Sequence, residues 1–241
     1  MKHAACAAAL LVWSGPAAAV TCDTVAFDGA DYSYCAVSPA TEELRLFLRD
    51  EAGEILGSFA AVEDHLGEGR TLPFAMNGGM YHSDRRPVGH YRENGEEEMR
   101  LVTSAGPGNF GLLPNGVLCI TEDAAQVHET LAFEAEGIAC RDATQSGPML
   151  VIDGALHPRF LPDSTSRYTR NGVGTSADGK LAIFVIANQP VTFYDFARFF
   201  RDFLDLPNAL YLDGKVSRLH APQINRSDFG FQLGPIVGVV E

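Results

Sequence analysis

The sequence carries little positive charge. Its 18 lysines and arginines stand against 31 aspartates and glutamates, which gives a formal net charge of −13. A chain this acidic is a poor partner for nucleic acid or an anionic membrane surface, so neither is expected. A small anionic substrate is still compatible, because screening at physiological salt acts over about 8 Å and the charges lining a pocket outweigh the total.

Long apolar runs are also missing, since no stretch approaches the roughly 20 apolar residues that a membrane-spanning helix needs. The apolar run over residues 4–13 follows Lys2 and precedes Ala17-Ala18-Ala19. This is the layout of a cleavable secretory signal over residues 1–19. We therefore expect a mature domain over residues 20–241, periplasmic or secreted and free of the membrane. Loss of Lys2 leaves 17 basic residues against 31 acidic ones, a net charge of −14.

No Cys-x-x-Cys spacing is present, and no histidine lies at a ligand offset from a cysteine, so a structural zinc site is disfavoured. Beyond the leader the chain has Cys22, Cys35, Cys119 and Cys140. An even number in an oxidising compartment predicts two disulfides. Three pairings are possible. We favour Cys22 with Cys35 and Cys119 with Cys140, because both pairs close local loops.

Several catalytic signatures are absent too. Ser146 does not lie in a Gly-x-Ser-x-Gly elbow, so no serine nucleophile is proposed. His82, Asp84 and His90 lack a fourth ligand, and a solvated loop explains them better than a metal ion. Neither a metal nor a cofactor is expected.

What the sequence does contain is a series of short apolar runs separated by turn residues. About 220 mature residues without a linker or repeat favour one domain. The pattern predicts an α+β fold, with a twisted mixed, mostly antiparallel β-sheet core covered by a few helices. Strands are expected at 44–49, 72–76, 149–152, 181–187, 209–212 and 234–240. Residues 109–120 read as a hairpin that turns at Pro114-Asn115-Gly116.

Two helices are predicted. One follows Ser58, a suitable N-cap, and ends at Gly67. The other runs from Phe193 to about Leu206 behind Thr192, and its phenylalanines recur on one face. That face is expected to cover the strand that leads to Asp213.

The strand over residues 209–212 ends on Asp213-Gly214, which supports two interpretations. Asp-Gly is a favoured two-residue turn of a hairpin. Alternatively, the strand holds the Asp213 carboxylate rigidly while the glycine lets a ligand approach. Taken alone, this stretch favours the turn, because such turns far outnumber catalytic ones.

Two other predicted strands end in polar or small residues, at Asn77-Gly78-Gly79 and at Arg170-Asn171. If these ends meet Asp213 and Ser217, one pocket would hold a carboxylate, a guanidinium, amide donors and a hydroxyl. Such a pocket suits a substrate with an anion and hydroxyl groups. Arg85 and Arg86 are further possible anion ligands, although surface arginines without a role are commoner.

Four motifs in this order and spacing resemble the phosphodiester glycosidase domain family, from about residue 40 to the end. They are Phe74-Ala-Met-Asn-Gly-Gly-Met-Tyr81, Gln145-Ser-Gly-Pro-Met-Leu-Val151, Arg170-Asn-Gly-Val-Gly174 and Leu210-Tyr-Leu-Asp-Gly-Lys-Val-Ser217. The resemblance matches Asn77, Gly78, Arg170, Asp213, Gly214 and Ser217 to family positions. Lys215 departs from the second glycine of many members, and Asn171-Gly172 departs from Thr-Ala.

The resemblance implies an exported hydrolase that cleaves a sugar from a sugar-1-phosphodiester. Asp213 and Arg170 are the expected catalytic residues. The expected substrate-binding residues are Asn77, Gly78, Gly79, Arg86, Asn109, Gln145, Ser146, Asn171, Gly214 and Ser217. The partner would be a small-molecule or glycan phosphodiester. The alternative is a non-catalytic glycan or cell-wall binding module on the same fold, which the loss of Trp13 with the leader disfavours.

Overall fold

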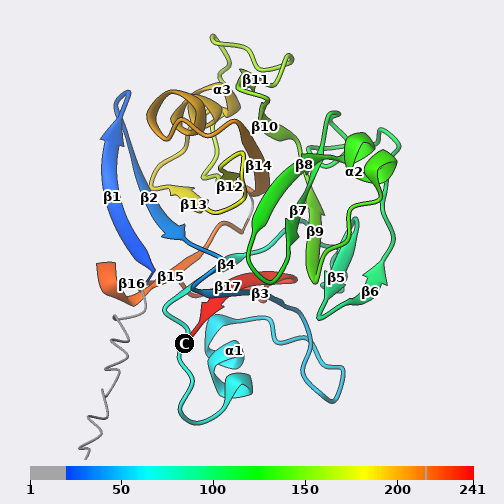
Figure 1. The fold of residues 1–241 in the computed structure, drawn as a ribbon. Coiled ribbons are helices and arrows are strands. Elements are labelled where there is room, and N and C mark those ends of the chain that lie inside the picture. Colours follow the sequence, from blue (N-terminus) through cyan, green and yellow to red (C-terminus); the bar gives the residue numbers. More distant parts are fainter. Residues whose placement is uncertain (1–19, 215) are drawn as a thin grey trace, which may run out of the picture.

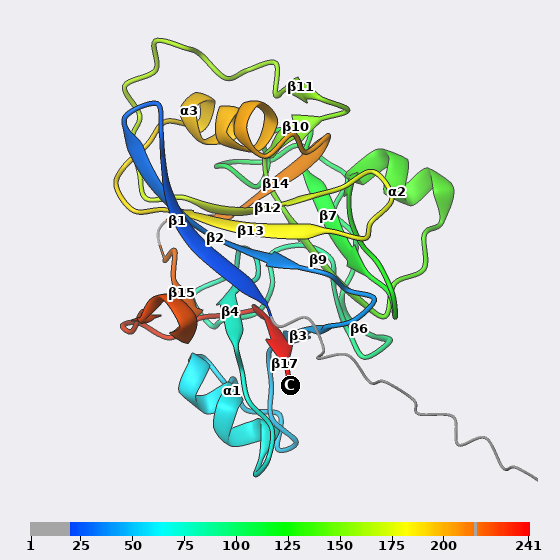
Figure 2. The same cartoon turned by 60° about the vertical axis from the view of Figure 1, so that its left-hand side comes forward.

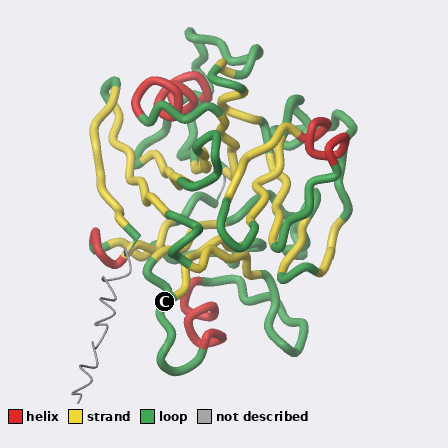
Figure 3. Tube along the Cα trace, viewed as in Figure 1, coloured by secondary structure: helices red, strands yellow, loops and turns green. Residues whose placement is uncertain are grey.

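A computed structural model describes residues 20–214 and 216–241 of the chain. The expected signal at residues 1–19 and the departure at Lys215 lie outside the described residues. Within the described ranges no helix is long and apolar enough to cross a membrane. The chain forms three β-sheets whose strand pairings are all antiparallel, with helices outside them (Figures 1 and 3).

The largest sheet has seven strands. In order across the sheet they are β1 (Thr21–Phe27), β2 (Ala30–Val37), β13 (Ala182–Ala187), β12 (Asn171–Thr175), β14 (Asn208–Asp213), β10 (Met149–Ile152) and β11 (Ala155–Leu156). Cys22 lies directly opposite Cys35 in the β1–β2 hairpin, and the two form a disulfide. This confirms the first predicted pair. The hairpin itself was not predicted.

The second sheet has five strands and carries the first predicted helix. Its strands are β16 (Arg226–Ser227), β15 (Leu219–Ala221), β4 (Phe74–Asn77), β17 (Ile236–Val240) and β3 (Glu43–Phe47), with the 3-10 helix η2 (Pro222–Ile224) between β15 and β16. Helix α1 (Phe59–Leu66) begins as predicted, because the Ser58 hydroxyl accepts a hydrogen bond from the Ala61 N–H at 3.1 Å.

The third sheet also has five strands: β6 (Glu96–Met99), β5 (Tyr91–Glu93), β9 (Asp142–Ser146), β7 (Gly116–Ile120) and β8 (Ala125–Glu129). The predicted hairpin over residues 109–120 is wrong. Both edges of β7 are occupied by β8 and β9, and residues 109–113 form turns. Those turns are fixed by side-chain bonding, since Asn115 Nδ2 donates to the Phe110 carbonyl. Cys119 and Cys140 form the second predicted disulfide.

The remaining helices cover two of the sheets. Helix α2 (Thr130–Glu136) was not predicted, and its N-cap is the Glu129 carboxylate. Helix α3 (Phe193–Arg198) has the predicted cap, with the Thr192 hydroxyl accepting from the Asp195 N–H at 3.0 Å. It continues as a single π-helical segment, η1 (Phe199–Phe203), and so ends slightly earlier than expected.

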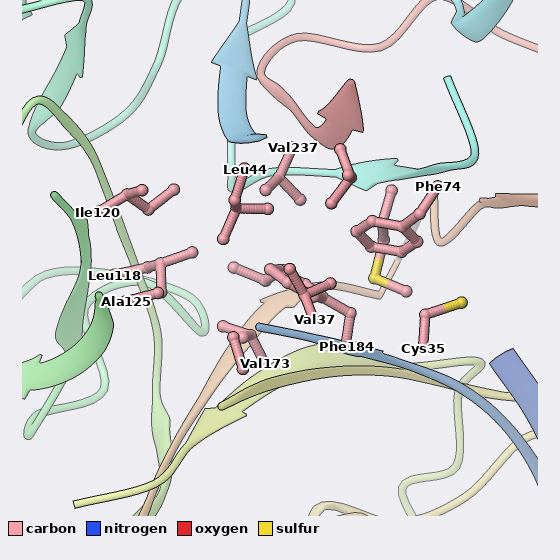
Figure 4. Packing of buried hydrophobic residues seen from close by; sticks show 14 of the residues in the cluster. Cys35, Val37, Leu44, Phe74, Leu118, Ile120, Ala125, Val173, Phe184 and Val237 are labelled. Atoms are coloured by element: carbon pink, nitrogen blue, oxygen red, sulfur yellow. The ribbon is translucent and has the colours of Figure 1, made fainter. Parts of the chain in front are cut away.

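The inner faces of all three sheets share one hydrophobic core (Figure 4). Val37 and Phe184 reach it from the seven-stranded sheet, Leu44 and Phe74 from the second, and Leu118 from the third. The helices pack on the outer faces, with α3 and α1 at opposite ends of the molecule in two views (Figures 1 and 2). The predicted α+β class is confirmed, but its core lies between three sheets instead of beneath a single one.

Candidate active site

Three strand ends from two sheets meet at one point. Asn77 ends β4 of the second sheet, whereas Asn171 begins β12 and Asp213 ends β14 of the first. Asn171 Nδ2 donates to Asn77 Oδ1 at 2.8 Å, and the Asp213 N–H donates to Asn171 Oδ1 at 2.8 Å. The two asparagines are fully buried. The convergence expected from the sequence is therefore present.

The chain leaves the first sheet at Asp213, the last residue of β14, and enters the second at Leu219, the first residue of β15. Because these strands do not pair, the interpretation of Asp213-Gly214 as a hairpin turn is wrong. Two hydrogen bonds hold the described part of the connecting segment. Ser217 Oγ donates to the Asp213 carbonyl at 2.8 Å, and the Arg218 N–H donates to Asn77 Oδ1 at 2.9 Å.

Gly214 is required by a close approach. A Cβ at this position would lie 1.8 Å from the Tyr211 hydroxyl, which no side chain can tolerate. The Gly214 N–H donates to Asp213 Oδ1 at 2.6 Å and thereby holds the carboxylate at the start of the segment. Burial raises the pKa of the Tyr211 hydroxyl, whose side-chain partners are Arg170 and Asn109. Asn109 thus reaches the site through Tyr211.

Arg170 lies beneath the site. Its side chain is among the largest fully buried ones, with the residue only 1% exposed. Nε donates to the Val191 carbonyl at 2.9 Å, Nη2 donates to the Ser166 carbonyl at 3.2 Å, and the guanidinium lies 3.6 Å from the Phe193 ring centre. Burial lowers its pKa. Two of its nitrogens donate to backbone carbonyls and the residue is buried, so in this arrangement Arg170 supports the site from within the protein.

Two hollows lie beside the described part of the connecting segment. The first, of about 500 Å³, includes Asp213, Tyr81 and Arg85 in its lining. The second, of about 470 Å³, includes Gly214, Ser217 and Arg218. Val216 and Phe231 line both hollows, so the two adjoin across the segment.

Arg85 and Arg218 differ from most arginines of this acidic chain. Among the described residues, neither guanidinium forms an ion pair with an acid, and Arg85 Nε is buried without a hydrogen-bond partner. Arg218 is nearly buried, and burial lowers its pKa. Burying a cation without an acid is costly, and anion-binding sites commonly require it.

The Tyr81 hydroxyl is influenced electrostatically by Asp213 and by both arginines. Burial and the negative charge of Asp213 raise the pKa of the Tyr81 hydroxyl, whereas Arg85 and Arg218 lower it. The Arg85 guanidinium also lies 5.4 Å from the Tyr81 ring centre. One carboxylate and two cations therefore act on a single hydroxyl, which places all four groups around the adjoining hollows.

Several predicted ligands occupy other positions. The Gln145 amide is buried and bonded to the backbone of His90 and Val102, and the Ser146 hydroxyl is buried and donates to the Leu212 carbonyl. These two residues support strands β9 and β14. Arg86 is exposed and paired with Asp84 at 2.7 Å.

The glycine pair after β4 is also largely occupied. The Gly78 N–H donates to the Pro235 carbonyl at 2.7 Å, so it is not one of the free amide donors expected at this strand end. Gly79 packs against Thr144, whose hydroxyl would lie 2.6 Å from an added Cβ. Asn77 is different, because its Nδ2 is buried without a hydrogen-bond partner among the described residues.

Three residues that line the hollows were not predicted from the sequence: Arg218, Tyr81 and Phe231. Arg218 directly follows Ser217, and Tyr81 ends the first motif, so proximity to the motifs was the available signal. Arg85 and Arg86 are consecutive, and no local pattern distinguishes the arginine that lines a hollow from the exposed one.

A different hollow, of about 580 Å³, lies at the third sheet. Its lining includes Glu93, Glu96, Glu97 and Glu98 with Arg49. Four carboxylates repel a phosphodiester, so this hollow does not suit the expected substrate. Arg49 is moreover engaged in an ion pair with Glu98 at 2.8 Å. The junction of β4, β12 and β14 remains the candidate active site.

Solved structures share this fold. The catalytic domain of zebrafish N-acetylglucosamine-1-phosphodiester alpha-N-acetylglucosaminidase, auto-inhibited by its pro-peptide, matches with a TM-score of 0.61 at 13% identity, over 91% of this chain and 81% of its own. A hypothetical protein from Synechocystis matches with a TM-score of 0.60 at 12% identity, over 92% of this chain and 61% of its own.

Sequence comparisons identify the family. The phosphodiester glycosidase family model matches residues 70–228. The uncharacterized protein YigE of Escherichia coli (strain K12) is 35% identical over 184 residues, which cover 76% of this chain and 72% of YigE. The chain belongs to the phosphodiester glycosidase family, as its four motifs indicate.

Proposed function

We propose that the chain is an exported hydrolase that splits a sugar from a sugar-1-phosphodiester, with Asp213 as its acid-base group. One observation carries this proposal: Asp213 lines a hollow together with Arg85, the adjoining hollow contains Arg218, and neither arginine has an acid partner among the described residues. Family membership supports the reaction class. The two disulfides and the expected leader support export.

The arginines would bind the phosphate. A phosphodiester carries one negative charge at neutral pH, and charge-assisted hydrogen bonds from guanidinium groups are among the strongest that proteins make. Arg218 and Arg85 are placed to supply them from the two hollows. The buried Asn77 Nδ2 is a further donor next to the Arg218 backbone.

Arg170 would be a positioning residue. Its guanidinium lies 5.6 Å from the Tyr211 ring centre, and the Tyr211 hydroxyl lies so close to Gly214 that a Cβ there would be 1.8 Å away. This approach restricts the position of Gly214 directly after Asp213. Asn171 would be a second positioning residue, because its side-chain oxygen accepts a hydrogen bond from the Asp213 N–H.

The reaction adds water across the bond that links the sugar to the phosphate. Asp213 takes a proton from the attacking water or returns one to the departing oxygen, and the products are a free sugar and a phosphate monoester. Hydrolysis in oxygen-18 water locates the attack. Label in the sugar hydroxyl marks attack at the anomeric carbon, and label in the phosphate marks attack at phosphorus.

The direct test is a screen of the mature protein against a panel of sugar-1-phosphodiesters, with the released sugar identified by mass. We expect release from at least one member, and loss of that release in Asp213→Asn. No release from any member, together with tight glycan binding, would favour the non-catalytic binding module instead.

A further inference from the structure

Two phenylalanines stand out on the surface beside the candidate site. Phe229 is 95% exposed and Phe231 is 82% exposed, more than any other large apolar residue described. They flank Gly230 in the loop of residues 228–232, which we call the aromatic loop. Two neighbouring aromatic side chains in water are unfavourable, and such patches commonly mark binding surfaces.

The aromatic loop is anchored at both ends. At its start, the Leu219 N–H donates to Asp228 Oδ2 at 3.0 Å, and the Asp228 N–H donates to the Leu219 carbonyl at 3.0 Å. Just beyond its end, the Leu233 N–H donates to the Gly57 carbonyl at 2.8 Å. The two rings are therefore presented by a fixed backbone.

Between the two rings the loop rests on Arg218. Gly230 has a φ of +145°, a conformation that side chains disfavour, and a Cβ there would lie 2.6 Å from Arg218 Nη2. The guanidinium proposed to bind phosphate thus also supports the aromatic loop. A ligand held by Arg218 lies next to Phe231, which lines the same hollow.

The two rings differ in their relation to the hollows. Phe231 lines both hollows, whereas Phe229 lines neither. A substrate confined to the hollows would therefore leave Phe229 without a contact. A ligand that contacts both rings has to extend past the hollows.

We propose that Phe229 and Phe231 form a stacking subsite for additional sugar units, so that the substrate is an oligosaccharide or polysaccharide carrying the phosphodiester. The identity of the reaction rests on the proposed function, but the subsite itself does not. A pyranose ring has an apolar C–H face that packs on an aromatic ring while its hydroxyl groups stay hydrated. Largely exposed rings on a loop that is anchored at both ends suit such a ligand.

The test uses phosphate-free probes, so that it does not depend on turnover. Linear oligosaccharides of two to about six glucose, mannose or N-acetylglucosamine units would be titrated calorimetrically into the mature protein. We expect at least one series to bind more tightly as its length increases. Phe229→Ala and Phe231→Ala should each weaken that binding about tenfold, the effect of losing roughly 1.4 kcal/mol.

The matched control is Leu131→Ala. Leu131 is 51% exposed and lies on α2, on the other side of the molecule from η2 and β16 (Figures 1 and 2). The Leu131→Ala variant should bind the oligosaccharides as tightly as the wild type does. Melting curves verify that all three variants fold, as expected for exposed positions.

Two results would overturn the subsite. One is the absence of binding by every series, or binding that both phenylalanine variants retain. The other is cosedimentation with neutral phosphatidylcholine vesicles that the two variants lose, which would make the aromatic loop a membrane anchor. Hydrolysis of a monosaccharide phosphodiester would uphold the proposed function in either case, so the two hypotheses fail separately.

Discussion

The side-chain oxygen of Asn171 accepts a hydrogen bond from the backbone N–H of Asp213 at 2.8 Å, at the first residue of one strand and the last residue of its neighbour. The other half of the same amide donates to Asn77 Oδ1. One buried side chain therefore ties the carboxylate-bearing strand to a second sheet. The position of Asp213 depends on this amide as much as on β14 itself.

Removing the Asn171 amide should destabilise the fold. Asn171→Ala removes the acceptor of the Asp213 N–H and one of the two donors to Asn77 Oδ1, which keeps the bond from the Arg218 N–H. Loss of hydrogen bonds to buried groups should cost about 1–3 kcal/mol in total. Urea unfolding measures the loss. Asn208→Ala is the control, because Asn208 lies at the opposite end of β14 and accepts one surface hydrogen bond from the Asp153 N–H. Equal losses in the two variants would contradict the role given to Asn171.

The same junction explains how far the sequence could lead. Strand positions, both disulfide pairs and the caps at Ser58 and Thr192 depend on local patterns, and the structure confirms them. The convergence of Asn77, Asn171 and Asp213 was stated only as a condition. It depends on which strands are neighbours, and strand order is a property of the whole sheet.

The direction of individual side chains could not be predicted from the sequence for a similar reason. Arg85 and Arg86 are consecutive, yet one lines a hollow and the other forms a surface ion pair. Gln145 lies in a motif but points its amide at the backbone of a neighbouring loop. The predicted hairpin at residues 109–120 failed because β8 and β9 occupy the edges of β7, which turn propensity does not reveal.

Arg218 and Arg85 should control substrate affinity. Arg218→Gln or Arg85→Gln removes a charge-assisted hydrogen bond worth about 1.5–3 kcal/mol, so KM for a sugar-1-phosphodiester should rise about 10-fold to 150-fold. Arg86→Gln is the matched control, since Arg86 is exposed and paired with Asp84, and its KM should stay near the wild-type value. Steady-state kinetics decide the matter, and an Arg86→Gln effect as large as the others would count against the assignment.

Arg170→Lys should lower the stability of the fold more than it weakens the affinity for substrate. A lysine keeps the charge but cannot donate to the Val191 and Ser166 carbonyls in the same geometry while its head group stacks on Phe193. We expect a loss of about 1–3 kcal/mol in the free energy of unfolding, measured by chemical denaturation. A variant with full stability and a sharply raised KM would instead indicate direct contact between Arg170 and the substrate.

Glu93 should make the fold less stable as the pH rises. Burial raises the pKa of its carboxyl from 4.5 to about 7, aided by the charge of Asp142. The folded protein therefore keeps a proton that the unfolded chain loses above pH 4.5. The contribution of the Glu93 carboxyl to the free energy of unfolding is fully present below pH 4.5 and is lost as the pH rises through 7.

Glu93→Gln tests this linkage, because an amide does not titrate and still accepts from the Tyr91 hydroxyl, now 2.7 Å from Glu93 Oε2. The melting temperature of Glu93→Gln minus that of the wild type should be larger at pH 8 than at pH 4. The control is Glu96→Gln on the neighbouring strand β6, which is exposed. A difference between Glu93→Gln and the wild type that does not vary with pH would refute the linkage.

Asp213→Asn separates catalysis from structure. Asparagine keeps the side-chain oxygen that accepts from the Gly214 N–H, and the backbone bonds to Asn171 and Ser217 are unaffected. The melting temperature should therefore be preserved. The acid-base group is lost, which typically lowers the rate by about 100-fold to 10,000-fold.

The chain provides a matched control in another Asp-Gly pair, Asp153-Gly154, which does form the turn between β10 and β11. Asp153 has a φ of 47°, a left-handed conformation that asparagine tolerates well, so Asp153→Asn should leave both rate and stability unchanged. Turnover of the sugar-1-phosphodiester found in the screen and thermal melts would be measured on both variants. Wild-type turnover in Asp213→Asn would eliminate the proposed mechanism while leaving the family membership intact, because the fold and the motifs do not depend on that proton.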